Sequence, residues 1–457
     1  MAQKPTFDYD IIIIGSGAAG SPAASILARA GKKVALIEKA AFGGESPNWG
    51  DIPTGALLHA AQVYRDAKTA AKFGLRTGAI GYNYPSLLRW RDIAVKRTGV
   101  SGNRSHYEKQ GISVFSGNAH FLSPNEITVS RRHLSAKKFL IATGSEWMIP
   151  TIPGLSDTPY HTPKTILSLT RPPKSLFIVG SGPTAMELAY LFSAFGTKVY
   201  IAEPAARILP SYDADVGALL ATDARERRGM TILPRSKVTF VKKDGPTKRV
   251  GYMQQGREQS VRVDEALVAV GRHPFTDLGL ENAGVAYTDD GITVSATLQT
   301  SARHIFAAGG VVDATAQTHD VLTHSRTAAH NLLRRQSIAL DVLPRLRVMF
   351  TEPEVAQTGL SEDDCLRRDL KVRTAVAPVT LTARSNIADE QVGFVKLISG
   401  PKGTLLGAVI AAPHASDMIT QLSLAIRHGL TASQLVSTPN CFVSWTEAIR
   451  IAAAKLL

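Results

Sequence analysis

Cysteine is almost absent from this chain of 457 residues, which contains only Cys365 and Cys441. The two cysteines lie far apart and lack the spacing of metal ligands, so they predict neither a disulfide framework nor a zinc site. His319 and His324 lack the spacing of a helical metal pair, and we predict no metal centre. Cys441 could be a structural or a reactive thiol, and so few cysteines suggest a reducing compartment.

Long apolar runs are missing as well. No run approaches the roughly 20 residues that cross a bilayer, and the opening MAQKPTFDYD lacks the basic and then apolar pattern of a signal peptide. Hydrophobic residues nevertheless make up 44% of the chain, enough for substantial cores in two or three domains. We therefore expect a globular cytoplasmic protein without a transmembrane segment.

Acidic residues are outnumbered, with 52 Lys and Arg against 38 Asp and Glu and a formal charge of +14. Such an excess can favour nucleic-acid binding by displacing phosphate counterions. The basic residues form only short groups, such as residues 89–97 and 131–138, and no nucleic-acid-binding module is recognisable. A solvated basic surface that attracts anionic cofactors or an acidic membrane face is the simpler interpretation, without specific nucleic-acid binding.

A glycine motif follows the first apolar strand of the sequence, as Gly15-x-Gly17-x-x-Gly20. An alanine-rich helix and a second apolar strand ending at Glu38 come next. The first glycine permits a tight turn, the second lets a diphosphate approach the backbone, and the third lets helix pack on strand. The helix N-terminus favours the diphosphate, and the Glu38 carboxylate can accept the ribose hydroxyls. The motif predicts a dinucleotide site.

The same unit returns near the middle of the chain, with Gly180, Gly182 and, at the third place, Ala185. Its second strand ends at Glu203, whose carboxylate would bind a free ribose 2′-hydroxyl and repel a 2′-phosphate, favouring NADH over NADPH. Arg207 lies close enough to soften that preference. Two dinucleotide units suggest a flavin that takes hydride from a nicotinamide.

The order of strands and helices predicts an α/β fold with two doubly wound, Rossmann-like nucleotide-binding domains and a C-terminal α+β domain. We place the first domain at residues 1–150 and 271–340, because the strand-then-glycine pattern returns there. The second domain is expected at residues 151–270. The α+β domain is expected at residues 341–457, where strands are followed by amphipathic helices.

Five further motifs occur in order along the chain: IATGS (141–145), VAVGRHPFTDLGLENAGV (268–285), ARHIFAAGG (302–310), VMFTEPEVAQTGLSEDD (348–364) and GFVKLI (393–398). With the two glycine units they make the whole chain resemble the flavoprotein disulfide reductases, also called pyridine nucleotide-disulfide oxidoreductases. Lipoamide dehydrogenase, glutathione reductase, mercuric reductase and soluble pyridine nucleotide transhydrogenase belong to this family.

The resemblance implies FAD in the first domain, NAD(H) in the second, and a C-terminal homodimer interface that completes each active site. NADP(H) is the less favoured nucleotide. The residues expected at the cofactors are Gly15, Gly17, Gly20, Glu38, Gly43, Gly44, Thr143, Gly144, Gly310, Gly180, Gly182, Ala185, Glu203 and Gly271.

The segment GGESPNWGDIPTG (43–55) departs from the family at its centre of chemistry. Ser46 and Asp51 stand where the family has the two cysteines that relay electrons to a disulfide substrate. Neither a hydroxyl nor a carboxylate can form a disulfide or act as a thiol nucleophile. By this comparison, the protein cannot run the dithiol relay.

Other departures agree with that loss. Gly55 stands where the family has a lysine near the flavin, although the glutamate that pairs with this lysine remains as Glu187. Phe442 stands where the family has its catalytic histidine, and the acid that supports this histidine remains as Glu447. A histidine that protonates a leaving thiol has no purpose without the thiols. Gly310 replaces an aspartate that contacts the flavin ribityl chain, and losing one charged hydrogen bond costs about 1.5–3 kcal/mol. This should weaken the flavin site without abolishing it.

Asp51 can be interpreted in two ways. It occupies the place of the cysteine nearer the flavin ring, where a partly desolvated carboxylate could deliver a proton as electrons leave. It could equally be a polar plug bonded to neighbouring amides.

We therefore expect a thiol-free FAD-dependent NAD(P)H oxidoreductase that passes electrons directly to a diffusible small-molecule acceptor such as a quinone. Glu187 is expected to orient the nicotinamide, while Ser46 and Asp51 line the acceptor pocket. The alternatives are a soluble pyridine nucleotide transhydrogenase, a decayed pseudoenzyme, and a non-catalytic flavin- or NADH-binding sensor. The intact glycine motifs of both units argue against decay.

Overall fold

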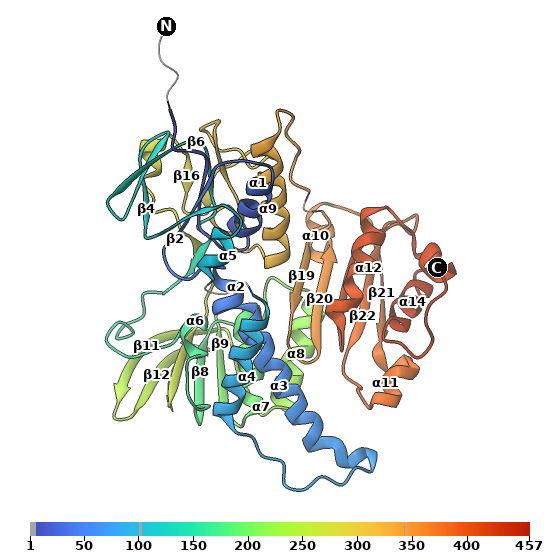
Figure 1. Cartoon of the computed structure of the whole chain (residues 1–457). Helices are drawn as coiled ribbons and strands as arrows, with labels where there is room; N and C mark the ends of the chain where they lie inside the picture. Colours follow the sequence, from blue (N-terminus) through green and yellow to red (C-terminus); the bar gives the residue numbers. More distant parts are fainter. Residues whose placement is uncertain (1–5, 100–102, 342) are drawn as a thin grey trace. The chain divides into compact units, whose positions relative to one another are not determined.

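A computed structural model of the chain describes residues 6–99, 103–341 and 343–457 (Figure 1). The chain divides into two compact units. Unit 1 contains residues 1–57, 83–149 and 271–342. Unit 2 contains residues 58–82, 150–270 and 343–457.

Unit 1 is built on a seven-stranded sheet whose parallel part places β1 between β2 and β6. The parallel strands are β1 (Tyr9–Ile14), β2 (Val34–Glu38), β3 (Ser113–Ser116), β6 (Arg132–Ile141) and β18 (Ile305–Ala307). β1, β2 and β18 are largely apolar, as expected of parallel strands that are covered on both faces. Helices α1 (Gly20–Arg29) and α9 (Thr318–Leu333) pack side by side in this unit (Figure 1). The Ser325 hydroxyl of α9 donates to the Ala19 carbonyl oxygen before α1, at 2.6 Å.

The rest of unit 1 extends this sheet and frames one end of it. Strands β4 (Ala119–Ser123) and β5 (Glu126–Val129) continue from β6 as an antiparallel meander. A short ladder joins β7 (Ser145–Trp147) to β15 (Arg272–Pro274). The remaining elements are α2 (Glu45–Asn48), the start of α3 (Asp51–Thr69), α4 (Tyr84–Arg97), α5 (Arg104–Glu108), η2 (Leu280–Ala283), β16 (Tyr287–Thr288), β17 (Gly291–Ile292) and η3 (Gly309–Val311).

Unit 2 contains a second parallel sheet in the order β10-β9-β8-β14. Its strands are β8 (Ser175–Val179), β9 (Lys198–Glu203), β10 (Thr231–Pro234) and β14 (Glu265–Val268), and its helices are α6 (Pro163–Ile166), α7 (Pro183–Ala194) and α8 (Ala214–Glu226). An antiparallel meander of β11 (Ser236–Asp244), β12 (Thr247–Gln254) and β13 (Arg257–Val263) accompanies it. The remainder of α3 and η1 (Ala70–Phe73) also belong to unit 2.

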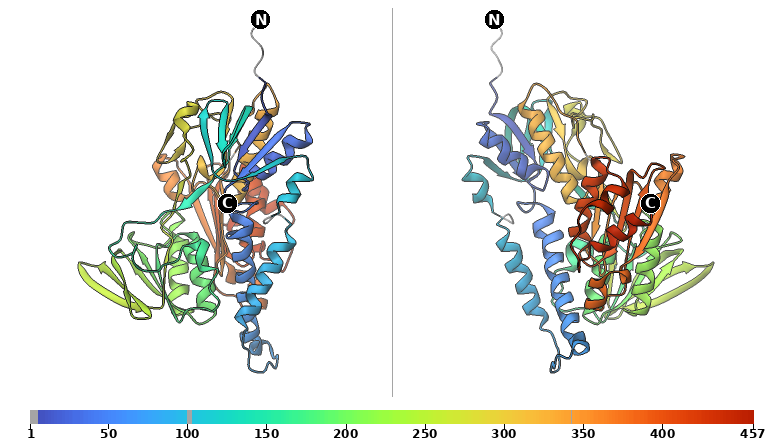
Figure 2. Two further views of the ribbon diagram at one scale, coloured as in Figure 1. Left: turned by 60° about the vertical axis from the view of Figure 1, so that its left-hand side comes forward. Right: turned by 90° about the vertical axis from the view of Figure 1, so that its right-hand side faces the viewer.

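The C-terminal part of unit 2 is a five-stranded antiparallel sheet in the order β19-β20-β23-β22-β21. Its strands are β19 (Leu346–Met349), β20 (Glu354–Gly359), β21 (Arg373–Pro378), β22 (Phe394–Ser399) and β23 (Leu405–Ala412). Helices α12 (Ala415–Arg427) and α14 (Glu447–Ala454) lie beside the strands of this sheet (Figure 2). The helices and the sheet share one apolar core. Smaller elements are α10 (Glu362–Arg367), η4 (Val379–Leu381), α11 (Ala383–Ala388) and α13 (Ala432–Ser437).

The predicted fold class is confirmed: two Rossmann-like parallel sheets with their helices are followed by an α+β domain. None of the helices in the described ranges combines the length and apolar character that a membrane span needs.

Candidate functional site

The first glycine loop joins β1 to α1 in unit 1. Gly15 has φ +104°, and a Cβ there would overlap the carbonyl oxygen of Ala142. A Cβ at Gly20 would overlap the carbonyl oxygen of Gly15. Glycine is needed at both positions, because the backbone turns tightly and the helix lies directly on the strand.

Gly17 lies between these two glycines and is open on its outer side. A Cβ on Gly17 would meet only the Cα of Gly44, at 3.8 Å, among the described residues. Gly44 has φ +70°, and its own Cβ would overlap Gly17. In the described structure no side chain caps the N-terminus of α1, and its first turn carries no acid. The free N–H groups are therefore left for an anionic group, and the cradle fits a dinucleotide diphosphate.

Glu38 ends β2 beside this loop and is buried. Its Oε2 accepts hydrogen bonds from the Ser16 amide at 3.0 Å and the Ser16 hydroxyl at 2.7 Å, and its Oε1 accepts one from the Ala40 amide at 2.7 Å. These bonds hold the carboxylate at the edge of the loop, the position expected for a residue that accepts ribose hydroxyls.

Unit 2 repeats this arrangement at the second loop. Glu203 ends β9, accepts the Ser181 hydroxyl at 2.5 Å through Oε2, and accepts the Ala205 amide at 2.8 Å through Oε1. A Cβ on Gly180 would lie 2.6 Å from the Ala269 carbonyl oxygen. A Cβ on Gly182 would meet no atom of the described residues within 4 Å. The loop is closed toward the sheet and open outward, which fits a second dinucleotide.

Two other predicted positions in this unit have distinct surroundings. Ala185 is buried in the first turn of α7, where a small residue suits the close packing of the helix. The guanidinium of Arg207 donates to the carbonyl oxygens of Tyr212 at 2.8 Å, Leu209 at 3.1 Å and Pro210 at 3.2 Å. Its donors hold the 209–212 loop, a role that its sequence position did not reveal.

The remaining predicted glycine sites lie in unit 1. The Thr143 hydroxyl donates to the Phe275 carbonyl oxygen at 2.8 Å, and Gly144 has φ +74°. Gly271 has φ +132°, and its carbonyl oxygen accepts the Met148 amide at 3.0 Å. These contacts join the strand ends on either side of the β7–β15 ladder.

Ser46 and Asp51 are brought together in unit 1. The Ser46 hydroxyl donates to Asp51 Oδ2 at 2.7 Å, and the Thr318 hydroxyl donates to the same oxygen at 2.6 Å. Asp51 begins α3 and Thr318 begins α9, so the start of two helices and the short α2 meet here. Thr318 was missed by the sequence analysis, because 267 residues separate it from Asp51.

An ion pair involves Glu45, the residue that precedes Ser46 in the sequence. Glu45, next to Ser46, forms a bidentate pair with the guanidinium of Arg272. Arg272 also donates to the Ser145 hydroxyl at 2.8 Å. A Cβ on Gly310 would lie 2.9 Å from that hydroxyl oxygen and 3.2 Å from the Ser145 amide, so a larger residue there would require Ser145 to shift. The close packing accounts for glycine at this position.

Glu187 and Glu447 both lie in unit 2. Glu187 Oε1 accepts the Phe350 amide at 2.9 Å, and burial together with the Glu187 charge raises the pKa of Tyr212. Glu447 begins α14, and its buried Oε2 has no hydrogen-bond partner among the described residues. Phe442 is 73% exposed in the single chain.

His324 and the two cysteines are the remaining residues considered from the sequence. His324 is buried, and its Nδ1 accepts the Gly309 amide at 3.2 Å, so this histidine holds the turn before η3. Cys365 is buried and Cys441 is exposed.

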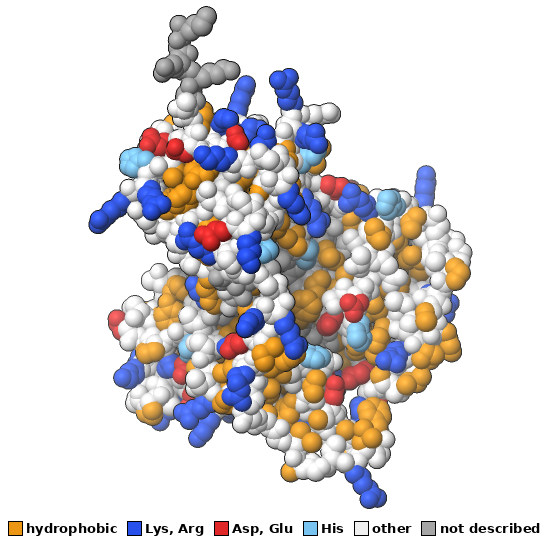
Figure 3. Space-filling view, viewed as in Figure 1, with side chains coloured by type: hydrophobic (Ala, Val, Ile, Leu, Met, Phe, Trp, Pro, Cys, Tyr) orange, Lys and Arg blue, Asp and Glu red, His pale blue; other side chains and the backbone are white. Residues whose placement is uncertain are grey.

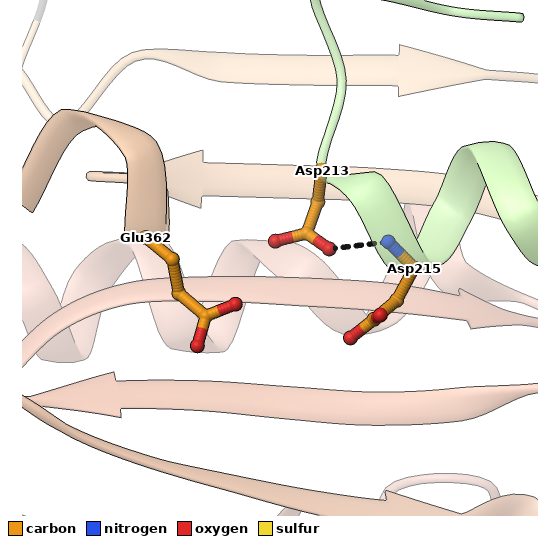
Figure 4. A group of neighbouring side chains, drawn as sticks. All are labelled: Asp213, Asp215 and Glu362. Carbon is orange, nitrogen blue, oxygen red and sulfur yellow. Dashed lines mark hydrogen bonds between the residues drawn. The ribbon is translucent and has the colours of Figure 1, made fainter. Parts of the chain in front are cut away.

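One acidic group in unit 2 has the spacing of metal ligands. Carboxylate oxygens of Asp213, Asp215 and Glu362 lie within 4.8 Å of one another around a common space (Figure 4). Lys396 Nζ lies 3.1 Å from Asp213 and 2.9 Å from Asp215, and it also pairs with Glu362. Burial alone would lower the pKa of Lys396, but the hydrogen bonds and charges of these carboxylates raise it. The Lys396 ammonium group thus supplies the positive charge that a metal ion would otherwise bring to these three carboxylates.

The basic side chains do not form one stripe on the face that Figure 3 shows. Lys and Arg lie scattered among polar and apolar areas of that face. This distribution on the face shown agrees with the short, scattered basic groups of the sequence.

Comparison with known proteins places the chain in a family. Residues 9–331 match the pyridine nucleotide-disulphide oxidoreductase family, and residues 346–453 match the dimerisation domain of the same family. A dihydrolipoyl dehydrogenase of Thermus scotoductus is 33% identical, with 98% of this chain and 97% of the relative covered. A mercuric reductase of Bacillus cereus is 31% identical, with 98% and 72% covered.

A solved structure gives the same result. The HOCl-induced flavoprotein disulfide reductase RclA of Escherichia coli, as its Cu(II) complex, superimposes with a TM-score of 0.87 at 27% identity. The likeness covers 99% of this chain and 100% of that chain. Members of the matched family are FAD-dependent oxidoreductases of pyridine nucleotides, and the dimerisation domain indicates a homodimer. The chain belongs to the pyridine nucleotide-disulphide oxidoreductase family, as a member without the redox-active cysteine pair.

Proposed function

We propose that this protein is a thiol-free, FAD-dependent NADH oxidoreductase that passes electrons directly to a diffusible acceptor such as a quinone. The observation that carries the proposal is the hydrogen bond from Ser46 to Asp51, at the two positions where related enzymes have their electron-relaying cysteines. A bonded hydroxyl and carboxylate cannot be oxidised to a disulfide. A disulfide substrate is therefore not expected to be reduced.

The FAD cofactor is assigned to residues 1–150 and 271–340. Gly15, Gly17 and Gly20 would hold the diphosphate at the start of α1, and Glu38 would accept the ribose hydroxyls. Gly43, Gly44, Thr143, Gly144 and Gly310 would line the rest of the site. When bound, FAD supplies the ability to accept a hydride and release electrons.

The nicotinamide nucleotide is assigned to residues 151–270, with Gly180, Gly182, Ala185 and Glu203 as its contacts and Gly271 at the return to the first domain. NADH is favoured over NADPH, because the buried Glu203 carboxylate would repel a 2′-phosphate. The carbonyl contacts of Arg207 add support, since they engage its guanidinium within unit 2.

The remaining site residues are proposed to have separate roles. Asp51 and Ser46 line the acceptor pocket, and Glu187 orients the nicotinamide. Glu447, at the start of α14, is the family's remaining supporting acid in the active site, within the proposed homodimer interface of residues 341–457. A cytoplasmic location is part of the proposal, because the chain has only two separated cysteines.

The test begins with the purified protein and its visible spectrum. Bound flavin should be bleached by NADH under anaerobic conditions and reoxidised by menadione. Thionicotinamide-adenine dinucleotide as the acceptor distinguishes a transhydrogenase, and the absence of turnover with every acceptor would indicate a sensor. A protein that stays colourless after FAD is added, or that reduces lipoamide as fast as menadione, would contradict the proposal.

A further inference from the structure

The hydrogen bonds around Asp51 all meet at one oxygen. Ser46 and Thr318 both donate to Oδ2, from α2 and from the start of α9. Oδ1 accepts no hydrogen bond from the described residues, and Asp51 itself is exposed. The carboxylate is thus held from one side, with the other oxygen presented to solvent.

The directions of these bonds decide what the group can bind. A serine or threonine hydroxyl has a single hydrogen to donate, and both hydrogens are already given to Asp51. The outward side therefore offers Oδ1 and hydroxyl lone pairs, all of which accept hydrogen bonds. It is complementary to cations and hydrogen-bond donors and unfavourable for anions.

The charge of Asp51 is not cancelled by an ion pair. No Lys, Arg or His of the described residues lies within ion-pair distance of its carboxylate. The neighbouring acid Glu45 differs in this respect, because Arg272 pairs with it. One uncompensated negative charge thus stands at the Ser46–Asp51 position, in a chain whose formal charge is +14.

We propose that Asp51, positioned by Ser46 and Thr318, makes the acceptor site selective for electron acceptors that carry positive charge close to the reacting ring. This inference rests on the proposed function and specifies its substrate class. Anionic acceptors are disfavoured at the site itself, even though the net charge of the whole molecule would attract them from a distance.

The reaction balances for a quinone with a charged substituent. NADH and one proton from solvent convert the quinone to its hydroquinone and give NAD⁺. The two quinone C=O bonds become C–OH bonds, and the nicotinamide is oxidised. The charge of the substituent stays unchanged, so it affects binding and approach without entering the electron balance.

The test uses two naphthoquinones with the same ring and the same methylene linker. One ends in a trimethylammonium group and the other in a sulfonate group. The value of kcat/KM is measured for each with the FAD-loaded enzyme and NADH, at low and at high salt. The ratio of the cationic to the anionic value is then compared between the wild type and Asp51→Asn.

We expect this ratio to fall about tenfold in Asp51→Asn at low ionic strength, because unit charges a few ångströms apart interact appreciably near a protein surface. The fall should shrink in high salt, where exposed charges are screened. Asp289→Asn is the matched control, since it removes a carboxylate from the exposed β16–β17 turn of the same unit. Asp51→Ser provides a second neutral variant, and the flavin spectrum verifies that each variant is folded.

Each outcome is decisive. An unchanged ratio in both neutral Asp51 variants overturns the inference, as does an equal change in Asp289→Asn, which would show an effect of total charge. A wild-type enzyme that oxidises NADH with neither quinone contradicts the proposed function and the inference with it. Turnover of both quinones without a shift in the ratio overturns the inference alone.

Discussion

The Ser46 hydroxyl donates to Asp51 Oδ2 at 2.7 Å, and Thr318 donates to the same oxygen at 2.6 Å. Ser46 and Asp51, the two positions at which the family resemblance places thiols, are thus linked here by a hydrogen bond between oxygens. This bond cannot store electrons, but it fixes the direction of a carboxylate.

Replacing Asp51 with Asn should slow the return of electrons to an uncharged acceptor. A positioned acid or base contributes about 10²–10⁴-fold to proton transfer, so reoxidation by menadione should fall at least about tenfold. Reduction by NADH should fall much less. Stopped-flow absorbance of the bound flavin measures both half-reactions, and equal losses in the two would argue against a role for Asp51 in electron release.

Replacing Thr318 with Val removes one of the two donors to Asp51 and keeps the side-chain size. The carboxylate should become less well oriented, and KM for a cationic quinone should rise about threefold, since a typical hydrogen bond contributes about 0.5–1.5 kcal/mol and this one orients the carboxylate without contacting the quinone. Steady-state kinetics with excess NADH measure this change. Thr318→Ser restores the hydroxyl and should restore KM; a defect that persists in Thr318→Ser would point to packing.

The choice of nucleotide should depend on Glu203 and hardly on Arg207. Glu203→Ser removes the charge that opposes a 2′-phosphate, so the preference for NADH over NADPH should fall about tenfold or more. Arg207→Ala should leave that preference nearly unchanged, because the guanidinium bonds to carbonyl oxygens of the chain. A selective loss of NADPH activity in Arg207→Ala would contradict this account.

Breaking the pair between Glu45 and Arg272 should destabilise unit 1. Both side chains are partly shielded, with 34% and 22% exposure, so Glu45→Gln should lower the thermal midpoint by a few degrees. Flavin fluorescence during heating follows the unit that is proposed to hold FAD. Glu146→Gln, which removes a more exposed partner of Lys39, is the control and should change the midpoint less.

The Lys396 cluster should stabilise unit 2 over a defined pH range. The pKa of Lys396 is raised by its carboxylate partners above its ordinary value of 10.5. A raised lysine pKa adds stability that is fully present below the unfolded value and is lost as the pH rises through the folded value. Lys396→Met should therefore lower the thermal midpoint by a constant amount from pH 6 to 9, and the difference should narrow above about pH 10.5. A difference independent of pH into the alkaline range would exclude the ionic contribution.

Much of the architecture could be predicted from the sequence, because each Rossmann unit is a local pattern. The glycines at 15, 17 and 20 and the acid at 38 lie in one short stretch, and the structure shows why glycine is needed at 15 and 20 and which donors hold the acid. The repeat of the same pattern at 180–203 allowed the second parallel sheet to be predicted. The apolar runs were enough to predict buried strands.

The contacts between distant segments could not be predicted in the same way. Thr318 meets Asp51 and Arg272 meets Glu45 only because the sheet of unit 1 brings separate segments together. Arg207 lies close enough in sequence to soften the NADH preference, whereas its donors hold a loop of its own unit. The sequence shows that a side chain can donate a hydrogen bond, but the fold determines which acceptor lies within reach of it.

The most direct measurement is an anaerobic titration of the FAD-loaded enzyme with NADH, followed by the visible spectrum. A site without a dithiol should take up a single hydride per bound flavin, so bleaching should be complete after one equivalent of NADH. Uptake of a second equivalent before the spectrum stops changing would reveal another redox group and would contradict the account.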